Sequence, residues 1–315
     1  MAEKLIKSNL VLSRLRRLVK SEQLVLSLLA LVVGAMAGGG TILFRDGILL
    51  VQALVYGWGE ESLHQHLMGL SNWHLVLGPT AGGLVVGVFI YKFLPGQRPH
   101  GVADVIDSAS FNDARMSTRC GIKSAIASAV SLGSGASLGR EGPVVHMGAS
   151  FGAWLARVLH LRRGAARTLL GCGVASAVAA SFNAPLAGMF FAHEVVLGHY
   201  ARTAFAPIVM SSVMGTVITR LYYGSEVAFL IPLHNIQSFW EFPAFALLGL
   251  LAGITAMLTV RAIPIVQKVA DTTRAPLWCR PAIAGLVVGI VGLGFPQIIG
   301  VGYGAMNDAL YETYS

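Results

Sequence analysis

Long stretches without a charged side chain dominate this chain and decide what it can fold into. About 20 consecutive apolar residues are enough to cross the hydrocarbon core of a bilayer as a helix. Charged residues make up only 12% of the chain and hydrophobic residues 55%. The uncharged stretches, each near or above spanning length, are 23–44, 73–91, 168–193, 203–219, 242–260 and 281–307. The pattern predicts an all-α polytopic membrane protein.

The first 23 residues differ from these stretches because they are basic and lack a long apolar core, so they do not read as a cleavable signal peptide. We expect residues 1–23 to form an amphipathic segment on the cytoplasmic face, in keeping with the positive-inside rule. The net charge of +8 then reflects topology and lipid headgroups, not nucleic acid. Three widely spaced cysteines indicate neither a disulfide framework nor a metal site.

The pentapeptide Gly139-Arg140-Glu141-Gly142-Pro143 places two charges between the uncharged runs 124–139 and 144–156. A charge at membrane depth costs about 2.5–3.5 kcal/mol on insertion scales, so it persists mainly along a pathway or beside a partner. Gly142-Pro143 predicts a chain break and a new helix with Pro143 in its first turn. A helix start attracts anions, and Glu141 would compete with them there. We considered two alternatives: that Glu141 merely caps the helix, and that Arg140 is only its salt-bridge partner.

The chain also repeats itself. The hexapeptide that begins at Gly83 recurs in nearly the same form at Gly285, 202 residues later, and His100-Gly101 is followed at almost the same offset by Tyr303-Gly304. Chance similarity of apolar six-mers is the alternative, but the paired spacing argues against it. Two similar halves with interrupted helices are typical of transporters and channels built from repeats. We predict tilted and broken helices in an inverted-type repeat, with 24–222 as the first repeat and 237–315 as the start of a second.

Two motifs give the chain a family resemblance. The segment 139–143, followed by Asn183-Ala184-Pro185-Leu186-Ala187-Gly188 and then Glu194, resembles the CLC family of chloride channels and chloride/proton antiporters. The resemblance implies that Glu141 is the gating glutamate, which occupies an anion site and swings away to admit chloride. It also implies a homodimer with one pore per subunit. No cofactor is implied.

The resemblance extends to Pro99-His100-Gly101-Val102-Ala103, which aligns with the family's first anion-binding segment. Anion-binding residues are then expected at His100, Gly101, Val102, Arg140 and Gly142. Here His100 stands where a serine commonly coordinates the central anion, so a role as ligand and a role as a satisfied interfacial histidine both stay open. His146 is expected to pack rather than to line the pore.

A second departure concerns proton coupling. Antiporters of the family resemble one another in carrying two adjacent acids after the Asn-Ala-Pro motif, whereas this chain has Glu194 and then Val195. Valine cannot carry a proton, so the resemblance favours channel-like or weakly coupled transport. Glu194 and the neighbouring His193 remain a possible proton path, although a structural role for Glu194, satisfied by backbone donors or an arginine, is the stronger expectation.

The function predicted from the sequence is a chloride channel of the cell membrane, multi-pass with a cytoplasmic N-terminus, of the voltage-gated CLC type, passive or weakly proton-coupled and gated by Glu141. A chloride/proton antiporter is the alternative. An intramembrane enzyme is disfavoured, because a His-Glu-x-x-His zinc motif starting at His193 would need histidine where Leu197 stands. The repeat offset places the second counterpart of Glu141 beyond Ser315, so we also considered that the chain is a fragment that does not transport.

Overall fold

The computed structural model describes residues 22–59, 69–198, 200–224, 238–273 and 275–310. Within these residues the chain is helical and contains no strand. The predicted basic segment 1–23 lies almost entirely outside this range. The helices are α2 Glu22–Tyr56, α4 Asn72–Phe93, η1 Pro95–Gln97, α5 Val102–Phe111, α6 Thr118–Gly133, α7 Glu141–Val158, α8 Arg163–Phe182, α9 Pro185–Phe191, η2 Ala192–Leu197, α10 Arg202–Tyr223, α11 Glu241–Thr272, α12 Arg280–Gly292, η3 Pro296–Ile298 and α13 Tyr303–Leu310.

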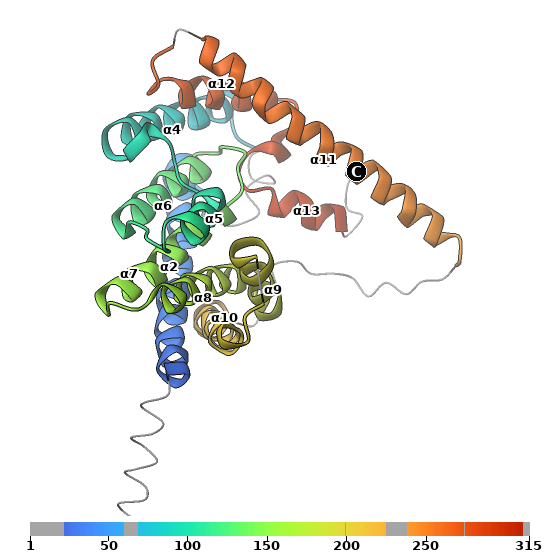
Figure 1. The fold of residues 1–315 in the computed structure, drawn as a ribbon. Coiled ribbons are helices and arrows are strands. Elements are labelled where there is room, and N and C mark those ends of the chain that lie inside the picture. Colours follow the sequence, from blue (N-terminus) through green and yellow to red (C-terminus); the bar gives the residue numbers. More distant parts are fainter. Residues whose placement is uncertain (1–21, 60–68, 199, 225–237, 274, 311–315) are drawn as a thin grey trace, which may run out of the picture.

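Five of these helices are long and apolar enough to cross a membrane by length and composition: α2, α4, α8, α10 and α11. Helix α2 runs through the middle of the molecule and packs against α10, α8, α6 and α7 (Figure 1). The prediction of an all-α polytopic fold is therefore confirmed.

Small residues let these helices approach closely. A Cβ atom added at Gly148 of α7 would lie 2.4 Å from the carbonyl oxygen of Gly173 on α8, and one added at Gly38 of α2 would lie 3.1 Å from the Cα atom of Gly215 on α10. In a bilayer the hydrophobic effect does not drive helix association, so close backbone approach and van der Waals packing supply much of the stabilisation. The glycines at these two helix contacts therefore serve packing.

Two uncharged stretches are not single helices. In 168–193 the chain leaves α8 at Asn183, whose φ of 56° is left-handed, and restarts at Pro185. Left-handed residues end helices, and proline is favoured in the first turn of the next one. In 281–307 the break begins before Pro296 and includes two glycines with positive φ, Gly300 and Gly302. The absence of charge did not reveal these breaks.

The two copies of the repeated hexapeptide lie on α4 and α12, which pack against each other (Figure 1). A Cβ atom added at Gly83 would lie 2.3 Å from the carbonyl oxygen of Pro281, and one added at Gly285 would lie 2.1 Å from that of Pro79. The offset of 202 converts residue 83 into 285 and residue 79 into 281. The two contacts are therefore equivalents of each other.

A second pair of contacts repeats this exchange. Gly87 faces Trp278, just before α12, and Gly289 faces Val76, again with an offset of 202 between equivalent positions. As residue numbers rise along α4 they fall along α12, so the helices are antiparallel. A contact that exchanges its two partners is the mark of a twofold relation, and antiparallel partners make the repeat an inverted one. The predicted inverted repeat is present, whereas its boundaries at 24–222 and 237–315 stay a prediction.

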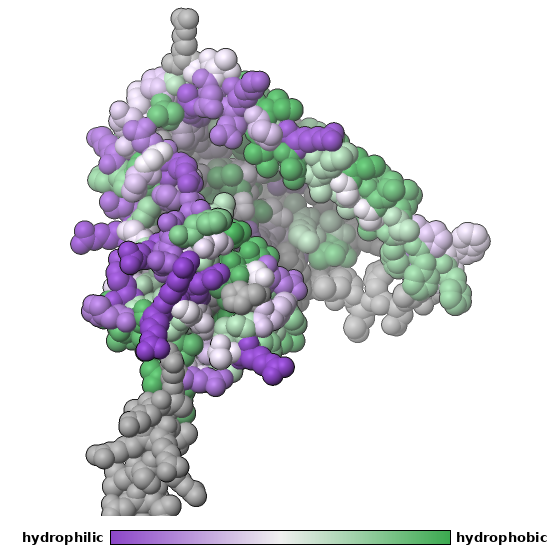
Figure 2. Space-filling model, viewed as in Figure 1, coloured by the Kyte–Doolittle hydropathy of each residue, from purple (hydrophilic) through white to green (hydrophobic). Residues whose placement is uncertain are grey.

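Helix α11 differs from the other spans because none of its 32 residues is buried. It runs diagonally away from the rest of the molecule in Figure 1, and Figure 2 shows hydrophobic side chains along much of its length. An apolar helix of this kind suits contact with lipid or with further protein.

Candidate anion site

The predicted helix break at Glu141 is found. Helix α6 ends at Gly133, the chain turns through Gly135 with a φ of 100°, and α7 begins at Glu141 with Pro143 in its first turn. Glu141 therefore lies at the end of a helix where unpaired backbone N–H groups and the helix dipole favour negative charge.

The Glu141 carboxylate has a partner from the second repeat. The hydroxyl of Tyr303, at the start of α13, donates a hydrogen bond to Glu141 Oε1 at 3.0 Å. The sequence singled out Tyr303 only as the repeat counterpart of His100. That offset was the one signal in the sequence that could have pointed to this contact.

Arg140 meets the same tyrosine. Its side chain is buried, the guanidinium carbon lies 4.0 Å from the centre of the Tyr303 ring, and one of its nitrogens reaches the carbonyl oxygen of Ser181. Cation–π contacts of this kind are stabilising, more so when desolvated. Arg140 and Glu141 are thus both held against Tyr303, which leaves the role of Arg140 toward anions a prediction.

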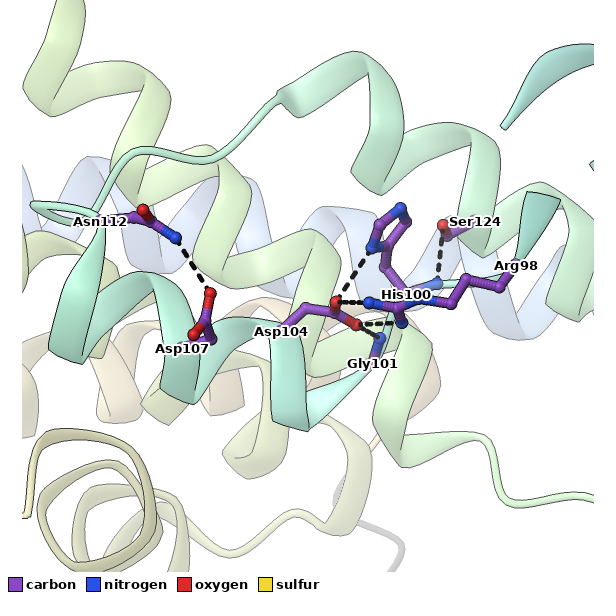
Figure 3. A network of polar contacts seen from close by, with 7 residues as sticks. All are labelled: Arg98, His100, Gly101, Asp104, Asp107, Asn112 and Ser124. Carbon is purple, nitrogen blue, oxygen red and sulfur yellow. Dashed lines mark hydrogen bonds and ion pairs between the residues drawn. The ribbon is translucent and has the colours of Figure 1, made fainter. Parts of the chain in front are cut away.

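The segment that resembles the family's first anion-binding motif forms the N-terminus of a second short helix. Gly101 is the N-cap of α5, and Val102 is its first residue. Asp104 Oδ2 accepts a hydrogen bond from the Gly101 amide at 2.9 Å, and Asp104 Oδ1 lies 3.2 Å from His100 Nδ1 (Figure 3). Ser124 of α6 accepts from the His100 amide at 3.2 Å. These contacts fix the backbone that leads into α5.

Arg98 completes the network around Asp104 with two hydrogen bonds to its carboxylate, of 2.5 and 3.1 Å (Figure 3). Burial alone would raise the pKa of the Asp104 carboxyl, but the hydrogen bonds from Arg98, the Gly101 amide and His100 outweigh burial and hold this pKa well below its usual range. Asp104 is therefore ionised at neutral pH and neutralises Arg98.

His146 of α7 was expected to pack rather than to line the pore, and its role in the pore is untested. It is buried, and its ring stacks on the ring of His100 with centroids 5.4 Å apart and an interplanar angle of 19°. His146 Nδ1 and His100 Nε2 are both buried and have no hydrogen-bond partner among the described residues. A buried polar atom without a partner costs about 1–3 kcal/mol, so a small group that bonds to these two nitrogens would be stabilised beside the stack.

Helix α7 links two levels of the candidate site, the first at Glu141 and the second at the His100–His146 stack. Glu141 begins α7 and His146 lies five residues further on, which corresponds to about 7.5 Å along the helix axis. The structure thus brings Arg140, Glu141 and Gly142 together at one level, and His100, Gly101 and Val102 together at the other.

The possible proton path lies in the π-helical turn η2, which packs against α5 and α8. His193 is fully buried and stacks on Tyr200 and Phe205. Glu194 is exposed and accepts a hydrogen bond from the Tyr200 hydroxyl at 2.7 Å. The donor to Glu194 is therefore a tyrosine, where we expected backbone amides or an arginine, and Val195 beside it is exposed.

The described residues offer no group of three or more histidines, cysteines or acids that could hold a metal ion. The three cysteines are free thiols. The chemistry available at the two helix starts is that of amide dipoles, arginines, two stacked imidazoles and two carboxylates, of which Asp104 is already paired with Arg98. These groups suit the binding of a small anion.

A polytopic helical membrane protein with an inverted repeat and broken helices defines a class of ion channels and transporters. Within that class, the family model described as voltage gated chloride channel matches residues 82–315. The chain belongs to this family. Membership places it among ion channels and transporters rather than enzymes.

Known relatives agree. A ClcB-like chloride channel protein of Ralstonia nicotianae is 31% identical over 287 residues, which cover 90% of this chain and 67% of the relative. The voltage-gated ClC-type chloride channel ClcB of Escherichia coli is 28% identical over 90% of this chain and 68% of its own length. The chloride channel protein CLC-f of Arabidopsis thaliana is 29% identical, and this chain spans only 38% of its length.

Two solved structures share the fold. A slow cyanobacterial Cl⁻/H⁺ antiporter has a TM-score of 0.73 and 23% identity, covering 90% of this chain and 67% of its own. A CLC-type fluoride/proton antiporter has a TM-score of 0.75 and 23% identity, covering 93% of this chain and 71% of its own. At this level of identity the likeness concerns the fold alone.

Proposed function

We propose that this protein forms a path for chloride-like anions across the cell membrane, passive or weakly coupled to protons and gated by Glu141. The observation that carries the proposal is the position of Glu141, a carboxylate at a helix start, hydrogen-bonded to Tyr303 and next to Arg140. The protein would act as a homodimer with one path per subunit and a cytoplasmic N-terminus, without a cofactor.

The backbone at both helix starts is open. A Cβ atom added at Gly101 or at Gly142 would meet no atom within 4 Å, so packing does not require glycine at either position. Glycine is also used where a ligand must approach the backbone closely. Amide N–H groups at Gly101, Val102 and Gly142 could then replace part of the hydration shell of an anion without burying a full positive charge.

Glu141 would act as a tethered anion that competes with the permeating one. In its ionised form it is held by the Tyr303 hydroxyl and by the positive end of α7. Protonation removes the charge that this helix end attracts. The side chain then competes less well, and the path opens.

Weak proton coupling is favoured by Val195, which has no titratable group. The second candidate is an antiporter, supported by the pair His193 and Glu194, of which the first is buried and the second reaches the surface. Simultaneous recording of chloride and pH on proteoliposomes separates the two. A fixed and sizeable proton-to-chloride ratio would reject the channel-like function.

The gate is tested by Glu141→Gln, which mimics protonation with almost the same shape. We expect chloride efflux from liposomes at neutral pH to rise severalfold. Glu241→Gln at the start of α11 is the matched control, because it makes the same chemical change far from α7, and its efflux should equal that of the unaltered protein. Equal efflux in all three proteins would reject the gating role of Glu141.

A further inference from the structure

A small cavity lies beside Tyr303. Its volume is about 40 Å³, enough for a few water molecules or one small ion. One face of α2 contributes Arg45, Ile48 and Gln52, α7 contributes Arg140, and the stretch 301–305 of the second repeat closes it. We call it the Gln52 cavity.

Two guanidinium groups give this cavity a positive lining. Arg45 is held in place by its contact with the Tyr223 ring, at 4.1 Å from the ring centre. The nearest acid in sequence, Asp46, accepts hydrogen bonds from the hydroxyls of Tyr222 and Tyr223 at 3.0 and 2.7 Å. Asp46 does not line the cavity, whereas Arg45 and Arg140 both do. The lining therefore favours a negatively charged occupant.

Gln52 is the second and independent sign of an occupant. Its side chain is only 4% exposed, and its Oε1 is buried without a hydrogen-bond partner among the described residues. Buried amides are normally satisfied. Because the two ends of an amide have nearly the same shape, a half-turn of this group presents two N–H donors in place of the oxygen. An anion in the cavity would accept from them.

We infer that the Gln52 cavity is a separate binding site for one small monovalent anion, with Gln52 and Arg45 as ligands that the sequence did not identify. The inference rests on the proposed function, because the cavity would bind an anion while Glu141 occupies the start of α7. The position of Tyr303 supports this, because the same residue lines the cavity and donates a hydrogen bond to Glu141. The small volume excludes bulky organic anions.

Bromide is the probe, because it replaces chloride and can be located by anomalous diffraction. The chain is purified in detergent and crystallised with bromide, and its affinity is measured by calorimetry. We expect an anomalous peak inside the Gln52 cavity. Gln52→Leu, which keeps the volume and removes both donors, should weaken bromide binding there about tenfold or more. Gln52→Glu should abolish the peak, because the new carboxylate takes the place of the anion.

Gln267 on α11 supplies the matched controls. It is exposed and lies outside the cavity, so Gln267→Leu and Gln267→Glu should both leave the peak and the affinity unchanged. If Gln52→Glu fails to fold, as judged by gel filtration, Gln52→Leu still decides the question. No peak in the unaltered protein, or a peak of equal height in the Gln52 variants, would overturn the inference. Bromide binding requires no transport, so a normal efflux response to Glu141→Gln together with an empty cavity would reject only this site.

Discussion

The two copies of the ring–glycine step, His100-Gly101 and Tyr303-Gly304, lie one residue away from the common offset of 202, near the start of a short helix in each case, but are held in different ways. Local bonds hold the first copy, since Asp104 of the adjoining helix binds both His100 and the Gly101 amide. A distant partner holds the second copy, since the Tyr303 hydroxyl bonds to Glu141, 162 residues away. Both copies precede or begin a short helix.

The two copies of the repeat therefore share the same backbone contacts but differ in the side chains that they carry. The backbone equivalence shows in the α4–α12 contact, where each glycine of one copy faces the same position as its counterpart in the other. The ring residues, by contrast, have different chemistry. One copy carries an imidazole, and the other carries the hydroxyl that binds Glu141.

The largest expected effect concerns the shared backbone. Gly83→Val and Gly285→Val each place side-chain atoms where a backbone carbonyl already lies within 2.3 Å of an added Cβ atom. Each should lower the free energy of unfolding by about 1–3 kcal/mol, the range for overpacking, and by similar amounts if the two copies are equivalent. Thermal unfolding in detergent measures this. Gly253→Val on α11, where an added Cβ atom meets nothing, is the control; a large difference between the first two variants would break the equivalence.

The second effect concerns the hydrogen bond between Tyr303 and Glu141, which are distant in sequence. Tyr303→Phe keeps the ring beneath Arg140 and removes only the hydroxyl that binds Glu141. A hydrogen bond to a charged group is worth about 1.5 kcal/mol or more, so Glu141 should leave its site more easily and chloride efflux should rise by about tenfold or more. Tyr91→Phe, an exposed position on α4, should change nothing. Efflux equal to that of Tyr91→Phe would mean that Tyr303 serves packing alone.

The third effect concerns the imidazole of the first copy. His100→Ser should shift anion selectivity or change the dependence of chloride flux on pH, because it removes the ring whose Nε2 is buried without a hydrogen-bond partner among the described residues. His146→Phe retains the stack but removes the second imidazole. Burial lowers the pKa of His146 and keeps its ring neutral between pH 5 and 8, so this variant should leave the midpoint of the profile unchanged. The other ionisable groups that act on His146 are Asp104 and Arg98, which both variants leave in place. Identical pH profiles and selectivities in the unaltered protein and His100→Ser would show that His100 only packs.

The smallest effect concerns the bonds that Asp104 makes at the start of α5. Because the pKa of Asp104 is lower in the folded protein, its charge stabilises the fold at pH values above the ordinary pKa of an aspartate, and this stabilisation is lost as pH falls. Asp104→Asn should therefore cost about 1 kcal/mol at pH 7, roughly the value of one net hydrogen bond. The difference should shrink steadily below about pH 4. Unfolding measured at pH 7 and pH 3 tests this, and a cost that does not change with pH would exclude the ionised carboxylate as its source.

Much of the fold could be predicted because residues inside a bilayer are mostly uncharged, so composition alone locates the spanning segments. The uncharged stretches located the spans, and Pro143 and Gly142 located the start of α7. The break near Pro296 was not predicted, because absence of charge cannot distinguish a spanning helix from a helix followed by glycine turns. Contacts between distant residues were also beyond reach: nothing near Glu141 in the sequence points to Tyr303 except the repeat offset.

The candidate site was predicted unevenly for the same reason. Motif residues such as Glu141 and Gly101 carry a recognisable local pattern, and the structure places them at helix starts. His146 and Gln52 carry none. Their meaning comes from burial without a hydrogen-bond partner, a property that exists only after the chain has folded.

The spacing between Glu141 and His146 along α7 has a consequence for how quickly a bound anion would leave. A charge at Glu141 and an anion beside His146 would be separated by about 7.5 Å along the helix. At an effective dielectric constant of about 20, two negative charges at that distance repel each other by about 2 kcal/mol, which is more than a tenfold change in residence time. Each arriving anion would therefore loosen the one ahead of it. A path with two such binding sites can bind its ion firmly and still release it quickly.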